Sequence, residues 1–238
     1  MQPLWREWPA RWQAALHACT RKGGQSKPLV VDPPATEQEV VAVEAQLGFR
    51  IPVHFRTVLT QFSAHVDVQW SFSEELYNQV KDTALLSGGN PHLSLGQFCL
   101  GDCGWNLYDL LRLEKERQEW DMGIDDDEDL LAMFGVWREK LVFRGERNGD
   151  ALGLGLATPH RAPVVYLAHD DFDDDYNGLH LGADFIEFID RLSLLGCVGG
   201  DISGIGPFTN GHKATGRIEV DGAYAQAWRA WFGVQNLT

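Results

Sequence analysis

Apolar residues recur three or four positions apart along several parts of the chain. In residues 4–19 the series is Trp5, Trp8, Trp12 and Leu16, which predicts an amphipathic helix. We interpret this wide apolar stripe as a face that docks on the rest of the domain rather than as a ligand site. The same spacing predicts further helices over residues 107–120, 185–196 and 224–231.

A pair of helices is predicted in residues 36–62. Thr36 is placed to cap the first helix, and Glu39, three residues later, completes a capping box. Gly48 supplies the stop of that helix. Pro52 then stands near the first turn of the second helix, a position that proline favours.

Strands are predicted where apolar and polar residues alternate. In residues 66–72 four apolar side chains share one face, and residues 137–156 are a hairpin around the turn pair Asn148-Gly149. Residues 93–100 and 164–167 are predicted as further strands. The Gly/Pro-rich stretch 22–34 is predicted as a connector and the glycine-rich stretch 196–216 as a loop.

Composition restricts the possible partners. The chain has 238 residues, of which 44% are hydrophobic, so it can bury a core. It carries 34 acidic against 20 basic residues, a net charge of −14. This charge argues against binding to nucleic acid through phosphates and against anionic membranes, and it favours basic proteins as partners. Charged residues interrupt the start of the chain, so we expect no signal peptide or membrane span and a cytoplasmic protein.

The negative charge is concentrated in residues 121–190, which hold 17 acidic and five basic residues. One run consists of Asp125, Asp126, Asp127, Glu128 and Asp129. The other consists of Asp170, Asp171, Asp173, Asp174 and Asp175, interrupted by Phe172. Like charges repel, so each run is either a solvated loop or a segment that a partner or cation neutralises.

Two common enzyme motifs and the paired cysteines of structural zinc sites are absent from the sequence. There is neither H-E-x-x-H nor G-x-S-x-G. The four cysteines, Cys19, Cys99, Cys103 and Cys197, form no C-x-x-C pairs and are interpreted as free buried thiols. The stretch before Lys213 only superficially resembles a phosphate-binding loop and is interpreted as a surface loop. We therefore predict no catalytic residue and no cofactor, and an enzymatic role is the weakest hypothesis.

One stretch matches the pattern of a calcium loop. Asp173, Asp175, Asn177 and Gly178 have the spacing D-x-[DN]-x-[DN]-G, and Asp184 stands at the twelfth position. The final position is Asp rather than Glu, and the segment before the loop is predicted as a strand rather than the usual incoming helix. Calcium binding therefore stays an alternative hypothesis, and we assign no metal ligands.

Two blocks of sequence resemble the SUKH superfamily, which contains Smi/Knr-type cell-wall regulators of fungi and many bacterial immunity proteins. The first block is Ala35-Thr36-Glu37-Gln38-Glu39-Val40, Glu44, Leu47-Gly48, Ile51-Pro52, Phe55 and Leu59. The second block is Asn148-Gly149-Asp150, Val164-Val165-Tyr166, His169-Asp170, Ala183-Asp184-Phe185 and Phe188-Ile189. The resemblance covers residues 36–196.

This resemblance implies a single α+β domain, with helices around a largely antiparallel sheet, that binds proteins and catalyses no reaction. The expected organisation is a Trp-rich helical extension and linker over residues 1–35, a SUKH-like domain over 36–196, and a Gly-rich loop with a C-terminal helix over 197–238. Bacterial members commonly neutralise toxins, many of which are basic nucleases.

Charge and resemblance together predict an immunity protein that binds a basic toxin, for example a nuclease. The partner-binding residues would be both acidic runs together with Trp120 and Tyr176, aromatic residues beside charge. Trp137 is interpreted as a core residue. The alternative from another functional class is a regulatory scaffold of the cell-wall-regulator type, which contacts several partners.

Overall fold

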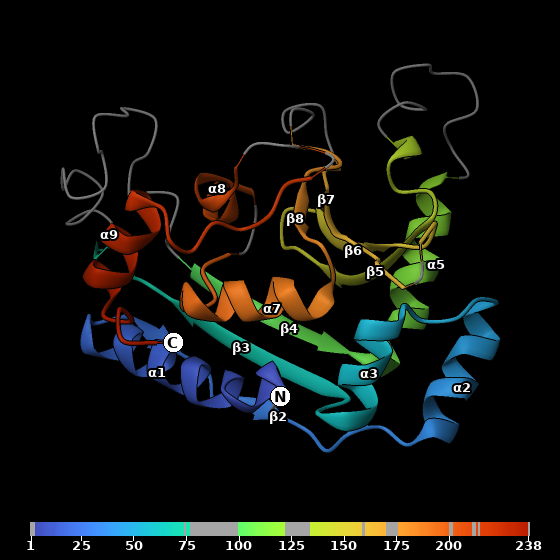
Figure 1. Cartoon of the computed structure of the whole chain (residues 1–238), viewed down its shortest axis with the longest axis horizontal. Coiled ribbons are helices and arrows are strands. Elements are labelled where there is room, and N and C mark those ends of the chain that lie inside the picture. The colour runs from blue at the N-terminus through green and yellow to red at the C-terminus, as the bar shows by residue number, and fades with distance from the viewer. Residues whose placement is uncertain are drawn as a thin grey trace.

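The computed structural model describes residues 3–73, 75–76, 100–121, 134–158, 160–169, 176–199, 202–210, 213 and 215–237 (Figure 1). Its helices are η1 (Leu4–Arg6), α1 (Trp8–Arg21), α2 (Glu37–Leu47), α3 (Val53–Gln61), η3 (Leu107–Asp109), α5 (Leu110–Asp121), α7 (Phe185–Leu194), α8 (Ile202–Ile205), η5 (Gly206–Phe208) and α9 (Ala223–Phe232). Its strands are β1 (Gln25–Ser26), β2 (Val30–Val31), β3 (His65–Ser71), β4 (Leu100–Asn106), β5 (Lys140–Gly145), β6 (Ala151–Gly155), β7 (Val164–Leu167) and β8 (His180–Gly182). The protein has the predicted α+β class.

Two antiparallel sheets lie at the centre of the molecule. In the first sheet, β1 and β2 pair with successive parts of β3, and β4 pairs with the other edge of β3. The second sheet has the order β5-β6-β7-β8. The predicted strands at 66–72 and 164–167 and the predicted hairpin are confirmed. In the hairpin, Glu146 N–H donates to the Asp150 carbonyl, and Gly149 takes the positive φ of 104° that the short loop requires.

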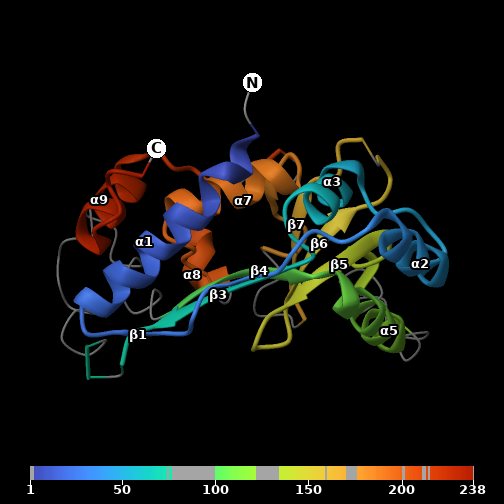
Figure 2. The same ribbon diagram turned by 90° about the horizontal axis from the view of Figure 1, so that it is seen from below.

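Helices cover the two faces of the sheets unequally. Helices α1, α3, α7 and α9 lie on one side of the strands, and α5 lies on the other side (Figure 2). The buried side chains of α1, α3, α7 and α9 join those of both sheets in one large core. A smaller core on the opposite face of the second sheet contains Leu113 of α5.

The N-terminal helix α1 docks on α7 and on the first sheet, as its apolar stripe predicts. Trp8 and Trp12 have no exposed surface. Trp8 Nε1 donates to Asp190 Oδ1 at 3.1 Å, and Arg11 Nη1 lies 2.6 Å from the same oxygen. The α-helix begins at Trp8 rather than at residue 4 because Pro9 favours the first turn.

Two further segments differ from the prediction, and a third is described at its last residue alone. The connector 22–34 contains the short strands β1 and β2, and the loop 196–216 contains α8 and η5. The predicted strand 93–100 lies outside the described residues except for Leu100, which begins β4. Strand β4 contains glycine where neighbouring side chains leave no room for a Cβ, since a Cβ on Gly101 would lie 2.0 Å from the Trp70 ring. Packing against Trp70, rather than strand propensity, therefore accounts for this glycine.

The predicted capping box is present at the start of α2. Thr36 Oγ1 accepts from Glu39 N–H at 3.3 Å, and Glu39 Oε2 accepts from Thr36 N–H at 2.8 Å. We expect Thr36→Ala to lower the free energy of unfolding by about 1 kcal/mol, because one N–H of the first turn loses its acceptor. Urea denaturation checks this value. Thr57→Ala in α3 is the matched control, because the Thr57 hydroxyl only donates to a carbonyl within its helix.

Candidate protein-binding surface

Trp137 joins the chain segments that flank the two acidic runs. The runs themselves, within residues 122–133 and 170–175, lie outside the described residues. Trp137, just after the first segment, donates from Nε1 to the Ala168 carbonyl, just before the second, at 2.9 Å. After the second segment, a Cβ on Gly178 would lie 3.4 Å from Val136 Cγ1. The flanks of both runs therefore share one anchor, which we call the Trp137 anchor.

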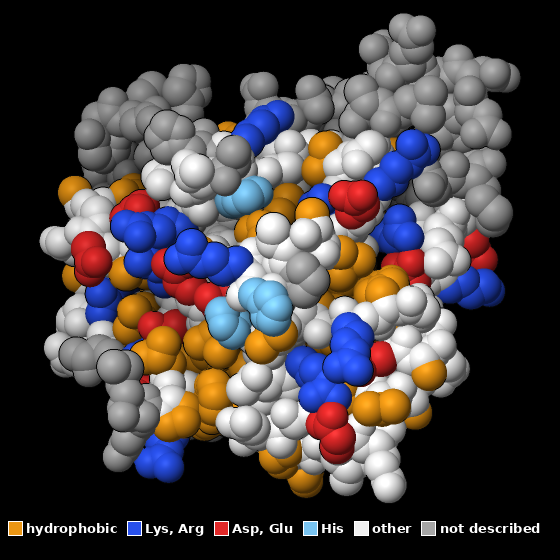
Figure 3. Space-filling model, turned by 45° about the vertical axis from the view of Figure 1, so that its right-hand side comes forward, with side chains coloured by type: hydrophobic (Ala, Val, Ile, Leu, Met, Phe, Trp, Pro, Cys, Tyr) orange, Lys and Arg blue, Asp and Glu red, His pale blue; other side chains and the backbone are white. Residues whose placement is uncertain are grey.

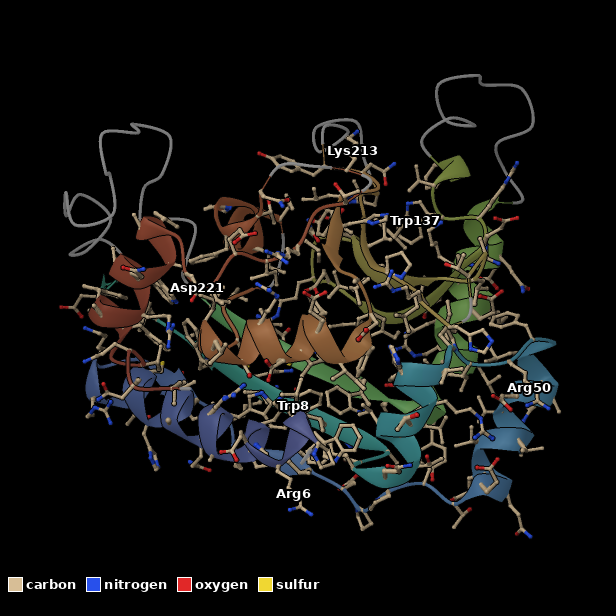
Figure 4. All side chains as sticks on the ribbon, viewed as in Figure 1. Arg6, Trp8, Arg50, Trp137, Lys213 and Asp221 are labelled. Carbon is tan, nitrogen blue, oxygen red and sulfur yellow. The ribbon has the colours of Figure 1, made fainter. Side chains whose placement is uncertain are left out.

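The Trp137 anchor rests on the smaller core. Trp137 is 7% exposed and lies beside β5 and β6, as Figure 4 shows. It belongs to the smaller core, which consists of Leu113, Phe134, Trp137, Val142, Ala151, Val165 and Leu167. The interpretation of Trp137 as a core residue is confirmed.

Asp150 holds His169, the residue that precedes the second acidic segment. Asp150 as a whole is 1% exposed, and its carboxylate accepts hydrogen bonds from Tyr166 Oη, from Asn148 Nδ2, and from both the backbone N–H (2.9 Å) and Nδ1 (2.8 Å) of His169. Burial alone raises the pKa of a carboxyl group, but these hydrogen bonds outweigh burial and lower the pKa of Asp150 below its ordinary value. His169, held through its backbone and its ring, is the last described residue before the run.

Of the predicted partner-binding residues, Tyr176 is the one whose side chain the structure describes. It directly follows the second acidic segment and is 41% exposed. Trp120 lies in the last turn of α5, and its side chain lies outside the described part of the structure. The predicted role of these residues and of the acidic runs stays a prediction.

Two side chains of the calcium-loop pattern, those of Asn177 and Asp184, are described, and both make contacts within the protein. Asn177 Oδ1 accepts from Ala168 N–H at 3.2 Å. Asp184 caps α7 by accepting from Ile186 N–H, and its second oxygen lies 2.9 Å from His54 Nδ1. Asp173 and Asp175 lie outside the described residues. Among those that are described, no three or more His, Cys, Asp or Glu side chains are grouped to hold a metal ion.

Two hollows along α5 were not predicted from the sequence. The first, of about 260 Å³, lies between β3, β4, β5 and α5, and we call it the α5 groove. The second, of about 190 Å³, is lined by Trp137 and Asp150. Both are lined by Leu113 and Gly145, so the α5 groove leads toward the Trp137 anchor. Nothing in the sequence indicates these hollows, because their walls come from distant segments.

The arginines of α5 are matched by acidic neighbours. Arg112 Nη1 lies 2.7 Å from Glu116 Oε1, and Arg117 Nη2 lies 2.7 Å from Glu114 Oε1. On the face in Figure 3, Lys and Arg side chains similarly lie beside Asp and Glu side chains. These arginines are neutralised by glutamates of the same helix, so they do not reduce the excess of negative charge that the acidic runs contribute.

A comparison with protein-family models matches residues 34–191 to the model described as the SMI1 / KNR4 family (SUKH-1). No curated protein and no solved structure is significantly similar to the chain. Within the described residues, no helix is both long and apolar enough to cross a membrane.

Proposed function

Because the chain belongs to the SMI1/KNR4 family (SUKH-1), we propose that it is an immunity protein that neutralises a basic toxin by binding it directly. Domains of this family generally bind proteins and are non-catalytic. The proposal assigns the chain no reaction, no cofactor and a cytoplasmic location, where a toxin that attacks the cell interior must be stopped.

The shared Trp137 anchor carries the proposal. Residues 121–190 have 12 more acidic than basic residues, and the flanks of their two acidic runs are joined by the hydrogen bond from Trp137 Nε1 to the Ala168 carbonyl. Negative charge that is concentrated in one part of the chain attracts a basic protein and raises its association rate. Tyr176, exposed beside the second run, supplies an aromatic contact.

Co-expression tests this function. The chain is expressed together with each toxin domain that is encoded next to its gene, and growth and complex formation are measured. We expect one toxin to be bound and its toxicity to be abolished. Binding to a partner whose activity is unchanged would favour the regulatory scaffold instead. Failure to bind or rescue against every neighbouring toxin would overturn the proposal.

Charge removal in the second acidic run tests the surface. We expect Asp173→Asn, Asp174→Asn and Asp175→Asn together to lower the association rate constant about tenfold at low salt, and to weaken its salt dependence. Both quantities are measured by stopped-flow fluorescence with the toxin that the chain neutralises in the co-expression experiment.

The matched control removes three exposed charges elsewhere, by Glu7→Gln, Glu75→Gln and Asp221→Asn. It changes the net charge equally and is expected to have a much smaller effect. Equal effects of the two triple variants would mean that net charge, rather than this surface, steers the toxin.

A further inference from the structure

The α5 groove lies on the face of the first sheet that points away from the main core. Along β3, Val66, Val68 and Trp70 are buried in that core, whereas His65, Asp67 and Gln69 alternate with them and face the groove. Asn106, Asp109 and Arg112 form part of the opposite wall. The groove is therefore lined mainly by polar side chains.

The positive charges of the α5 groove are already paired within the chain. Arg112 bonds to Glu116 at 2.7 and 2.9 Å and lies 4.0 Å from Asp109. Arg144 crosses from β5 to pair with Asp102, and its Nε lies 3.5 Å from Glu146. Each guanidinium therefore already lies beside two carboxylates of the chain itself.

Asp67 is the exception among the groove's charged groups. Its carboxylate is half-buried and has neither an ion pair nor a side-chain hydrogen bond among the described residues. The other described carboxylates that lack a partner are exposed: Glu7, Glu75, Glu139 and Asp221. Two residues along the same strand, Gln69 Oε1 is buried and accepts no hydrogen bond in the part of the chain that is described. Two acceptors on one wall thus lack a donor. An unsatisfied acceptor that is partly buried lowers the stability of the fold.

The edge of β4 adds backbone groups to this wall. Asp102 N–H donates to the Cys197 carbonyl at 2.8 Å, so the peptide groups of Asp102 point away from β3. Two residues later, Gly104 has the same orientation and faces the groove. No backbone group in the described ranges pairs with Gly104 on that side. An extended segment in the groove can bond there as an added strand does.

We propose that the α5 groove binds an arginine or lysine side chain, carried on an extended segment of the protein partner, with Asp67 as its counter-ion. This inference rests on the proposed function, which supplies the protein partner. It adds that the partner presents a cationic side chain to the groove. A cation in the groove satisfies Asp67 and donates toward Gln69, and its segment runs along α5 toward the Trp137 anchor. The groove and the acidic runs then recognise the same basic protein.

Titration with a short peptide tests this inference without the toxin. The full chain, labelled with ¹⁵N, is titrated with blocked Val-Arg-Val, and amide shifts are followed by NMR. The control peptide carries citrulline, which has the shape of arginine without its charge. We expect saturable shifts at Asp67, Gly104 and Asn106, and about tenfold weaker binding of the citrulline peptide.

Two variants then locate the counter-ion. Asp67→Asn keeps the side-chain size and is expected to weaken arginine-peptide binding about tenfold, whereas Asp221→Asn, at the α9 end of the molecule in Figure 4, leaves it unchanged. Thermal unfolding confirms that both variants are folded. Absence of saturable shifts, equal binding of the two peptides, or full binding by Asp67→Asn would overturn the inference. Since no toxin is used, its failure is distinct from failure of the rescue experiment.

Discussion

Asp150→Ala is expected to lower the free energy of unfolding by about 3–5 kcal/mol. Its buried carboxylate accepts from Tyr166, Asn148 and twice from His169. Alanine leaves the Tyr166 hydroxyl and the His169 backbone N–H without that acceptor, and unsatisfied buried donors are costly. Urea denaturation measures the loss. Asp221→Ala, which removes an exposed carboxylate, is the control and is expected to change stability by less than about 0.5 kcal/mol.

The stabilisation by Asp150 is expected to depend on pH. Because its pKa is lower in the folded than in the unfolded protein, the ionised carboxylate stabilises the fold fully above its unfolded pKa of about 3.9. This contribution is lost as pH falls through the lower folded pKa. The stability difference between the natural protein and Asp150→Asn should therefore be constant from pH 7 to about pH 5 and shrink below pH 4. A difference that grows on acidification would contradict the assigned hydrogen bonds.

Asp150 also connects stability to the proposed surface. His169, which it holds, directly precedes the second acidic segment, and Tyr166 Oη in turn accepts from Ile202 N–H at 3.1 Å. One carboxylate thus ties the hairpin, β7 and the segment after α7 together. The sequence resemblance includes Asn148-Gly149-Asp150 as one of its motifs, and the structure gives this motif a physical role in joining those segments.

Local patterns explain which elements were predictable. The capping box of α2, the stripe of α7 and the turn at Asn148-Gly149 depend on residues close in sequence, and all three are present. Strand β4 depends instead on distant contacts. Its Gly101 makes room for Trp70, and a Cβ on Gly104 would lie 2.9 Å from Arg144 Nη1. Such residues have low strand propensity when they are read without their neighbours.

The candidate surface was predictable only in part. Charge counting finds the acidic runs, because charge is additive along the chain. It does not find their common anchor, which requires Trp137 to reach a carbonyl 31 residues away. Nor does it distinguish Asp67 from other aspartates. Alternation places Asp67 on the polar face of its strand, but its lack of a partner follows from how Arg112 and Arg144 are paired.

Trp12→Ala is expected to destabilise the whole domain by about 3–5 kcal/mol. Trp12 has no exposed surface, and its ring lies 6.0 Å from Phe62 and 6.1 Å from Trp105, measured between ring centroids. Alanine would leave a cavity between α1, α3 and β4. Trp12→Phe is the matched variant and is expected to lower the free energy of unfolding by less than about 1.5 kcal/mol. Trp12 Nε1 has no hydrogen-bond partner among the described residues, so the change to Phe removes no hydrogen bond.

The shape of the unfolding transition makes this experiment a test of domain organisation as well as of packing. The sequence places residues 1–35 outside the SUKH-like domain, yet Trp12 packs against Phe62 and Trp105 of that domain. If the N-terminal helix folds with the domain, Trp12→Ala shifts one cooperative transition, and tryptophan fluorescence and circular dichroism report the same midpoint. Two separated transitions, with the later one unchanged from the natural protein, would show that the helix is an independent addition.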